Sequence, residues 1–211
     1  MLVKTIVENS LIIAAEAFWI FSSWSQLRRL VKTRNRKGLS APNQTLNAAG
    51  NIAWIAYFAS QALPVPVLTN LITFTLTVAT LAYTLGNRKQ FLRGIVAIAL
   101  VAPLTSYVLI AYSSVSGWVG VIYNLIASLP WVIHVVTSKK TSGISEKSLL
   151  FAYSAMLATL TYALLIGSLP LQVGTCIGLL NMTIVTTYYY RYRHEAADKG
   201  KEEPTPLPPA F

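Results

Sequence analysis

One carboxylate lies in the middle of an apolar stretch of the sequence. Glu16 falls near the centre of the apolar run 5–27, and Glu8, the only other carboxylate in the seven apolar runs of the chain, falls near its outer edge. A charge at mid-membrane depth costs roughly 3 kcal/mol or more on insertion scales. Burial favours the neutral acid, so such a group can exchange protons. Glu16 is therefore a candidate proton-coupling or substrate-cation site. The alternative is a protonated carboxyl group hydrogen-bonded to a neighbouring helix.

Polar side chains recur at helical spacing in the next two apolar runs. In the run 43–62, one helical face carries Asn47, Asn51, Trp54 and Phe58. In the run 66–86, one face carries Asn70, Thr73, Thr77, Thr80 and Thr84. Polar stripes in lipid must face protein or a cavity, so the two faces could line one water-filled path. Bonding between helices is the alternative; it suits the threonines better, whereas Trp54 and Asn70 suit a pocket.

The sequence lacks the patterns that support enzyme chemistry. It shows no metal-ligand cluster, phosphate-binding glycine loop or nucleophile–base motif. The single cysteine, Cys176, excludes an internal disulfide. His134 falls at the end of an apolar run beside a basic loop, where a solvated histidine is a simpler interpretation than a pH switch. We therefore expect no enzyme activity, no cofactor and no metal.

The elements that position these residues are predicted to be membrane helices. Hydrophobic residues make up 54% of the 211 residues and charged residues only 11%, against about 25% charged in soluble domains. Runs of about 20 apolar residues are long enough to cross a membrane, and seven are present: 5–27, 43–62, 66–86, 92–112, 115–136, 148–167 and 170–190. We interpret the first run as a retained span and not a signal peptide, because a basic n-region and a cleavage site are missing.

The cations predict the orientation of these spans. The net charge is +10, and 16 of the 17 Lys and Arg residues lie in the segments 28–42, 87–93 and 137–147 and in the polar tail. Because they separate apolar runs, we expect contact with the lipid bilayer and not with nucleic acid. By the positive-inside rule these segments are cytoplasmic, which places the N-terminus outside and the C-terminus inside. A plasma membrane, the inner membrane of a prokaryote, is the expected location.

The chain contains an internal repeat with a shift of 105 residues. Ser25–Ser40 then superimposes on Pro130–Ser145, with the identities Val31/Val136, Gly38/Gly143 and Ser40/Ser145. If the second half followed the three spans of the first half directly, it would have the opposite orientation in the membrane. One span must therefore act as a linker that restores the orientation. The sequence therefore predicts an all-α membrane protein with two parallel three-helix bundles joined by a linker helix (3+1+3). The predicted parts are 1–91, the linker 92–112, 113–192 and a disordered tail over 193–211.

Two copies of a loop motif accompany this layout. Thr33–Ser40 reads T-x-x-x-x-G-L-S, and Ser138–Ser145 reads S-x-x-x-x-G-I-S. With the 3+1+3 layout, they make the chain similar to the PQ-loop superfamily, and within it to the seven-helix SWEET-like transporters, over about residues 5–192. The Pro-Gln pair that names the family reads Ser25-Gln26 in the first half and Pro130-Trp131 in the second.

The resemblance implies hinges and a substrate pocket. Two of the four hinge prolines of SWEET-like proteins match this chain, at Pro42 and Pro130, although Pro42 also suits the first turn of a helix. An aromatic or polar residue that faces an asparagine forms the family's pocket, which corresponds here to Trp54 and Asn70. We assign Asn51, on the same face as Trp54, to the pocket as well.

The second half offers less symmetric contributions to this pocket. Thr159 aligns with Trp54, and the asparagine of this half comes later, at Asn181. Tyr123 and Asn124, on the first helix of this half, can add hydrogen bonds. We therefore expect a lopsided pocket.

These features favour a carrier of a small polar solute, most simply a sugar, that works by alternating access between two bundles. A carrier of amino acids or other metabolites, coupled to protons through Glu16, is the near alternative. The KDEL receptor resembles this fold and gives an alternative of another class. A receptor of that kind needs cations in its cavity to bind a carboxylate, and the apolar runs contain almost none. Copies of the same chain are possible partners.

Overall fold

A computed structural model describes residues 2–87, 89–96, 98 and 116–198 of the chain. Over these residues it contains six long helices and no strand. The helices are α1 (Leu2–Thr33), α2 (Ala41–Ser60), α3 (Pro64–Leu85), α5 (Ser116–Ser138), α6 (Glu146–Ile166) and α7 (Leu169–Asp198). The prediction of an all-α chain is confirmed for this part of the protein.

Serine and glycine residues mark several helix ends. The hydroxyl groups of Ser40 and Ser145 each accept a hydrogen bond from the backbone N–H three residues later, and so cap the N-termini of α2 and α6. At the C-termini of α3 and α6, Gly86 and Gly167 adopt the left-handed conformation that glycine favours. The two serine caps lie 105 residues apart.

Two helices extend beyond the predicted spans. The first span was expected to end at residue 27, but α1 continues to Thr33 and includes the cations of 28–32. The tail was expected to begin at residue 193, but α7 continues to Asp198. Arg, Lys, Leu, Glu and Ala are strong helix formers, so both helices continue after hydrophobicity ends.

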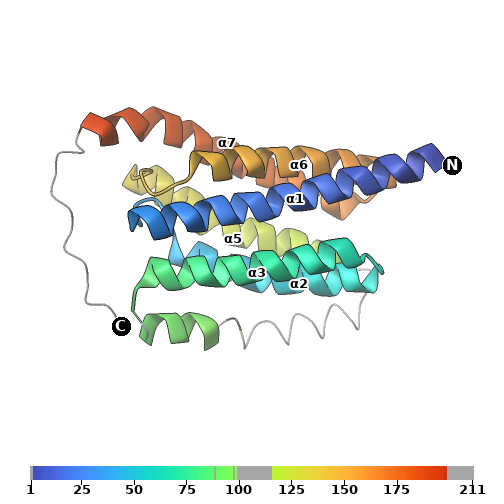
Figure 1. Cartoon of the computed structure of the whole chain (residues 1–211), viewed down its shortest axis with the longest axis horizontal. Coiled ribbons are helices and arrows are strands. Elements are labelled where there is room, and N and C mark those ends of the chain that lie inside the picture. The colour runs from blue at the N-terminus through green and yellow to red at the C-terminus, as the bar shows by residue number, and fades with distance from the viewer. Residues whose placement is uncertain (1, 88, 97, 99–115, 199–211) are drawn as a thin grey trace.

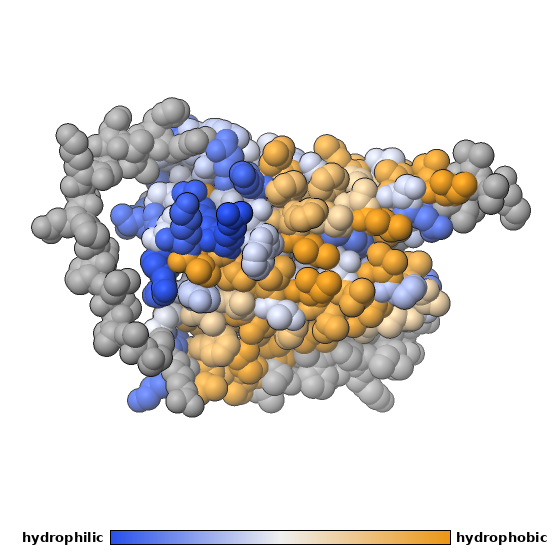
Figure 2. Space-filling model, in the orientation of Figure 1, coloured by the Kyte–Doolittle hydropathy of each residue, from blue (hydrophilic) through white to orange (hydrophobic). Residues whose placement is uncertain are grey.

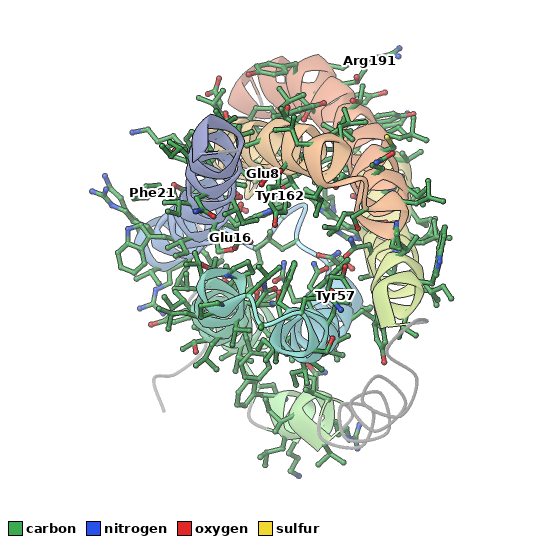
Figure 3. The ribbon with its side chains drawn as sticks, turned by 90° about the vertical axis from the view of Figure 1, so that its right-hand side faces the viewer. Glu8, Glu16, Phe21, Tyr57, Tyr162 and Arg191 are labelled. Carbon is green, nitrogen blue, oxygen red and sulfur yellow. The ribbon has the colours of Figure 1, made fainter. Side chains whose placement is uncertain are left out.

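The six helices form a ring. Figure 1 shows them lying side by side along the long axis, and Figure 3 shows the ring from its end. Contacts pair α1 with α3 and α6, α2 with α3 and α5, and α7 with α5 and α6. The order around the ring is therefore α1, α3, α2, α5, α7, α6. Helices α2 and α6 run opposite to the other four (Figure 1).

The loops that carry the cations lie at one end of the ring. The cationic segments 34–40 and 139–145, together with the turn 86–87, are at the same end in Figure 1. The hydrophilic surface collects there, and an apolar surface covers most of the visible remainder (Figure 2). We call this end of the molecule the basic end.

Five of the described helices are long and apolar enough to cross a membrane: α1, α3, α5, α6 and α7. Large apolar side chains face outward on them, for example Leu68, Leu150 and Leu180. Membrane helices are thus supported, as predicted. Helix α2 has 20 residues but is less apolar. The cause is a set of carboxamides on this helix, at Asn43, Gln44, Asn47 and Asn51.

A further helical segment, 89–96, packs outside the ring (Figure 3). Phe91 and Ile95, together with Ile98, pack against Ala48 of α2 and Leu81 of α3. The predicted linker begins here at residue 92, and its part from 99 to 112 lies outside the described residues.

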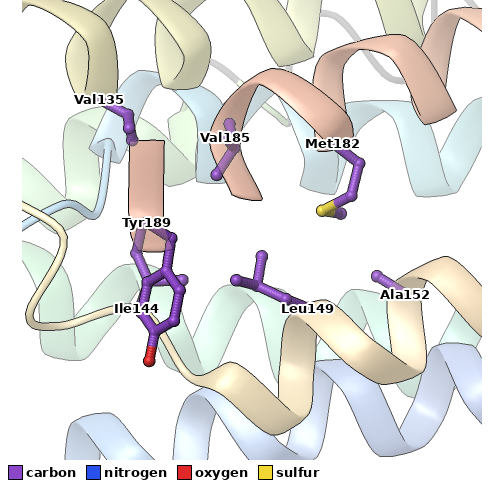
Figure 4. Close-up of a cluster of buried hydrophobic side chains, with 7 residues drawn as sticks. All are labelled: Val135, Ile144, Leu149, Ala152, Met182, Val185 and Tyr189. Carbon is purple, nitrogen blue, oxygen red and sulfur yellow. The ribbon is translucent and has the colours of Figure 1, made fainter. Parts of the chain in front are cut away.

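Apolar clusters hold the two ends of the ring. Figure 4 shows the cluster between α5, α6 and α7, which consists of Val135, Ile144, Leu149, Ala152, Met182, Val185 and Tyr189. A second cluster, toward the other end, consists of Ile12, Phe58, Tyr162, Ala163 and Leu171.

Candidate functional site

A cavity of about 330 Å³ lies inside the ring and is lined by residues of all six helices. Its volume is near the lower limit of small-molecule sites, which measure roughly 300–1,000 Å³. The lining mixes carboxamides, hydroxyl groups and aromatic rings with apolar side chains. The ring therefore encloses a space suited to one small solute.

All but one of the predicted binding residues line this cavity: Trp54, Asn51, Asn70, Asn124, Thr159 and Asn181. The exception is Tyr123, whose Cβ faces Gly50 at the contact between α2 and α5. One residue along a helix turns the side chain by about 100°, so Tyr123 and its neighbour Asn124 cannot face the same way.

Trp54 is held in the cavity wall by a hydrogen bond to the neighbouring helix. Its indole N–H donates to Oδ1 of Asn124 on α5, with a distance of 3.3 Å between the two atoms. Its ring stacks on Phe58, with 5.5 Å between the ring centroids. Gly120 provides the space, because a Cβ at this position would come within 2.7 Å of the indole. A large aromatic surface is thus fixed at the cavity.

Asn70 on α3 and Asn181 on α7 are held by short hydrogen bonds. These helices are the third helix of each half. The Asn181 amide donates to Oγ of Ser128 at 2.6 Å, and the Asn70 amide donates to the carbonyl oxygen of Pro66 at 2.8 Å. Neither bond uses the Oδ1 atom of the asparagine. Both side chains can thus remain oriented while they present an acceptor to a solute.

The threonines of α3 bond within their own helix. The hydroxyl groups of Thr73, Thr80 and Thr84 each donate to a backbone carbonyl three or four residues earlier. These donors therefore do not bond a neighbouring helix, which was the role expected for them. Thr73, Thr77 and Thr80 line the cavity, whereas Thr84 is not among the lining residues.

Glu16 is buried in the cavity wall between α1 and α3. Its side chain is 6% exposed and is hydrogen-bonded to Thr69 of α3. Figure 3 shows it on the inner side of the ring, while Phe21 of the same helix points outward. The position facing the cavity suits a proton-coupling site, and the bond to α3 suits the alternative of a helix-bridging carboxyl group.

Two loops bonded to each other cap the cavity at the basic end. The Gln26 amide donates to the carbonyl oxygen of Gly143 at 3.0 Å, and the Trp131 indole donates to the carbonyl oxygen of Gly38 at 3.2 Å. Residues 26 and 131, like residues 38 and 143, are 105 positions apart. Each half of the chain therefore holds the glycine loop of the other half.

The loops also contact each other directly. The Gly143 N–H donates to the carbonyl oxygen of Lys37 at 2.8 Å. The Asn35 amide donates to Oγ of Ser142 at 3.0 Å. A Cβ at Gly143 would collide with backbone carbonyls of the first loop, so this position requires glycine.

Below the loops, further bonds join α1 to α6 and α2 to α5. The Ser22 hydroxyl donates to the carbonyl oxygen of Ser148 at 2.9 Å between α1 and α6. The Asn43 amide donates to the carbonyl oxygen of Ala127 at 2.7 Å between α2 and α5. The 105-residue shift relates these two bonds as well.

The sequence prediction missed Gln26, Trp131 and Asn43 as residues that join the two halves. The signal was present, because Gln26 and Trp131 occupy the second position of the degenerate Pro-Gln pair in each half. Their partners could not be predicted, since the repeat relates equivalent positions and does not indicate which loop each side chain reaches.

The two predicted hinge prolines have different surroundings. Pro42 lies in the first turn of α2, two residues after the cap residue Ser40. Its placement is that of a helix-start proline, which was the alternative. Pro130 lies inside α5, where its missing N–H removes one backbone hydrogen bond. A hinge function remains a prediction for both.

Within the described residues, no group of three or more His, Cys, Asp or Glu side chains is placed to hold a metal ion. No family model, curated protein or solved structure matches the chain.

Proposed function

We propose that the protein is a seven-helix carrier of the PQ-loop superfamily that moves a small polar solute across a membrane. In this proposal, two parallel bundles, α1–α3 and α5–α7, are joined by a linker helix and rock about the central cavity. A sugar is the leading solute.

The helix contacts support the two-bundle arrangement. Exchanging α1 with α5, α2 with α6 and α3 with α7 converts the set of six contacting helix pairs into itself. Each bundle keeps its third helix between the other two. The seams between the bundles are then α1–α6 and α2–α5.

The loops support the same pseudo-symmetry in more detail. Arg34 and Lys139, 105 residues apart, both adopt a left-handed backbone with φ near 54°. A non-glycine residue rarely takes this conformation, so its recurrence at equivalent positions is informative. The serine caps, glycine contacts and seam bonds recur with the same shift.

The observation that carries the proposal is the single cavity bounded by both bundles and capped at the basic end. A carrier needs a binding site that opens to one side at a time. The Gln26 and Trp131 bonds join the two bundles at one end. Breaking them is the movement that would admit a solute from that side.

The chemistry of the lining supports a neutral polar solute. Carboxamides and hydroxyl groups match the hydroxyl groups of a sugar, and Trp54 offers an aromatic face. The lining contains no Lys or Arg among the described residues. This composition disfavours a receptor of the KDEL type, which must bind a carboxylate.

Glu16 supports a second candidate, a proton-coupled carrier of amino acids or other metabolites. It is a carboxyl group within the cavity wall that lies within hydrogen-bonding reach of another helix. A change in its protonation can therefore alter the contact between α1 and α3.

We further propose that the basic end faces the cytoplasm of a prokaryotic cell. The positive-inside rule supports this orientation, because the described cationic loops 34–40 and 139–145 lie at one end. It places the N-terminus outside and the C-terminus inside.

Uptake into liposomes tests the proposed function. The purified protein is reconstituted and offered radiolabelled sugars and amino acids, with and without a pH gradient. We expect saturable uptake of at least one sugar without a gradient. Uptake that requires the gradient would favour the second candidate, and no uptake of any compound would contradict both.

Matched tryptophan variants show whether uptake uses the cavity. Trp54→Ala removes an aromatic wall of the cavity, and we expect uptake to fall by roughly tenfold or more, since buried aromatic anchors contribute about 2 kcal/mol or more. Trp24→Ala is the control, because this side chain is 52% exposed on the outside of α1. Equal losses in both variants would argue against transport through this cavity.

A further inference from the structure

The two walls of the cavity differ in chemistry. Helices α2 and α3 are neighbours in the ring, and α6 and α7 are neighbours on the other side, separated from them by α1 and α5. We call the lining faces of α2 and α3 one wall, and those of α6 and α7 the other. Most lining residues pair with a lining residue 105 positions away. The repeat therefore allows a comparison of the two walls position by position.

The comparison shows that the wall of α2 and α3 is the more polar one, while Thr159, Thr175 and Asn181 add a smaller number of polar groups to the wall of α6 and α7. On the second helices, Gln44 and Asn51 correspond to Leu149 and Met156. On the third helices, Thr73 corresponds to Gly178 and Thr77 corresponds to Met182. The polar member belongs to the first half in every one of these pairs.

Met156 and Gly178 form the middle of the apolar wall. The Met156 Cε lies 3.2 Å from the point that a Cβ of residue 178 would occupy, so its side chain packs directly on this glycine. Methionine is flexible and polarisable, and it packs against both aliphatic and aromatic partners. This wall can thus adapt to an apolar group of a bound molecule.

Each wall rejects the wrong surface. A hydroxyl group turned toward the Met156 and Met182 side chains, out of reach of Asn181, would lose its water without gaining a partner. A hydrocarbon turned toward Asn51 and its neighbours would leave the carboxamides unpaired. A molecule that satisfies both walls has hydrogen-bonding groups on one side and hydrocarbon on the other.

We infer that the solute of this cavity is uncharged and amphipathic, and specifically an alkyl or aryl glycoside in preference to a free hexose. The sugar ring faces α2 and α3, and the alkyl or aryl group faces α6 and α7. The inference rests on the proposed carrier function, whose sugar it specifies. The lining residues include no Lys, Arg or His among those described, which leaves an anionic group without a partner.

Direct binding measurements test the inference separately from transport. The full chain in lipid nanodiscs is titrated by calorimetry with free hexoses and with the matching phenyl and butyl β-glycosides. We expect at least tenfold tighter binding of a glycoside than of its free hexose. Equal or weaker binding of every glycoside would overturn the inference, and so would a lack of binding by all compounds.

Variants of one repeat-related pair of residues show which wall causes the preference for a glycoside over a free hexose. Met156→Asn introduces the side chain found at the equivalent position 51, and we expect it to reduce the glycoside preference by at least threefold. Met156→Leu keeps the wall apolar and should retain the preference. Asn51→Met should weaken both ligands. An unchanged preference in Met156→Asn would show that the apolar wall does not bind the substituent.

The two proposals fail in different ways. Tight glycoside binding without uptake of any labelled sugar or glycoside would contradict the carrier function but still support the inferred ligand class. Uptake of free hexose with no preference for its glycosides would support the carrier and overturn the ligand class.

Discussion

At the scale of single residues, Glu16 is the side chain whose chemistry differs most from its surroundings. It is a buried acid in a wall of amides, hydroxyl groups and hydrocarbon, and it joins α1 to α3 through Thr69. The charged and neutral forms of the acid bond differently, because the carboxylate only accepts whereas the neutral acid can also donate. A change in protonation would therefore change the hydrogen bond between α1 and α3, as the proposed proton coupling requires.

Glu16→Gln tests whether this acid couples transport to protons. Glutamine has nearly the same shape and cannot ionise. We expect the variant to lose any stimulation of uptake by an inward proton gradient, while uptake without a gradient persists. The measurement is the initial rate in liposomes at several external pH values.

Glu8→Gln is the control for this experiment, because Glu8 lies two turns away on the same helix, outside the cavity lining. A gradient response that survives in Glu16→Gln would remove Glu16 from the coupling mechanism and leave the helix-bridging role.

At the scale of elements, the contact between the two glycine loops depends on the absence of side chains. Gly143→Ala would place a Cβ against backbone carbonyls of the first loop, 2.7 Å from that of Asn35. Such overpacking costs about 1–3 kcal/mol. We therefore expect the unfolding temperature of the protein in nanodiscs to fall by roughly 2–12 °C, as followed by tryptophan fluorescence.

Gly50→Ala is the matched control for the loop variant. Its Cβ would meet Tyr123 at 3.7 Å, an ordinary contact distance. Alanine is also favoured over glycine within a helix by about 1 kcal/mol. We expect no loss of stability there. A similar decrease in both variants would mean that any added methyl group destabilises the protein, whether or not it lies in the loop contact.

The elements show which parts of the structure can be predicted from sequence. The six long helices, the lining face of α2 and most of the site residues follow from local spacing, because Asn51 and Trp54 share one face wherever the helix packs. The length of α1 does not follow from hydropathy, since its last turns are charged. The bonds of Gln26 and Trp131 link segments more than 90 residues apart, and no local pattern specifies such partners.

At the scale of the whole molecule, the proposed alternating access requires the two halves to separate at the basic end. Asn35 and Ser142 are bonded across that boundary. In a Cys176→Ser background, the pair Asn35→Cys and Ser142→Cys should form a disulfide on oxidation. We expect the cross-link to stop uptake and a reducing agent to restore it.

The single variants Asn35→Cys and Ser142→Cys, oxidised in the same way, are the controls for the cross-link and should remain active. Full uptake by completely cross-linked protein would show that the basic end need not open, and alternating access between the bundles would then be wrong.

The division of polar and apolar walls also affects how the chain is made. Helices α1, α2 and α3 leave the ribosome before α6 and α7, so the carboxamides of α2 enter the bilayer before the opposite wall exists. Unpaired amides are costly in hydrocarbon. Biosynthesis must therefore keep the unfinished first half next to water, the insertion machinery or another chain until the last helices close the ring.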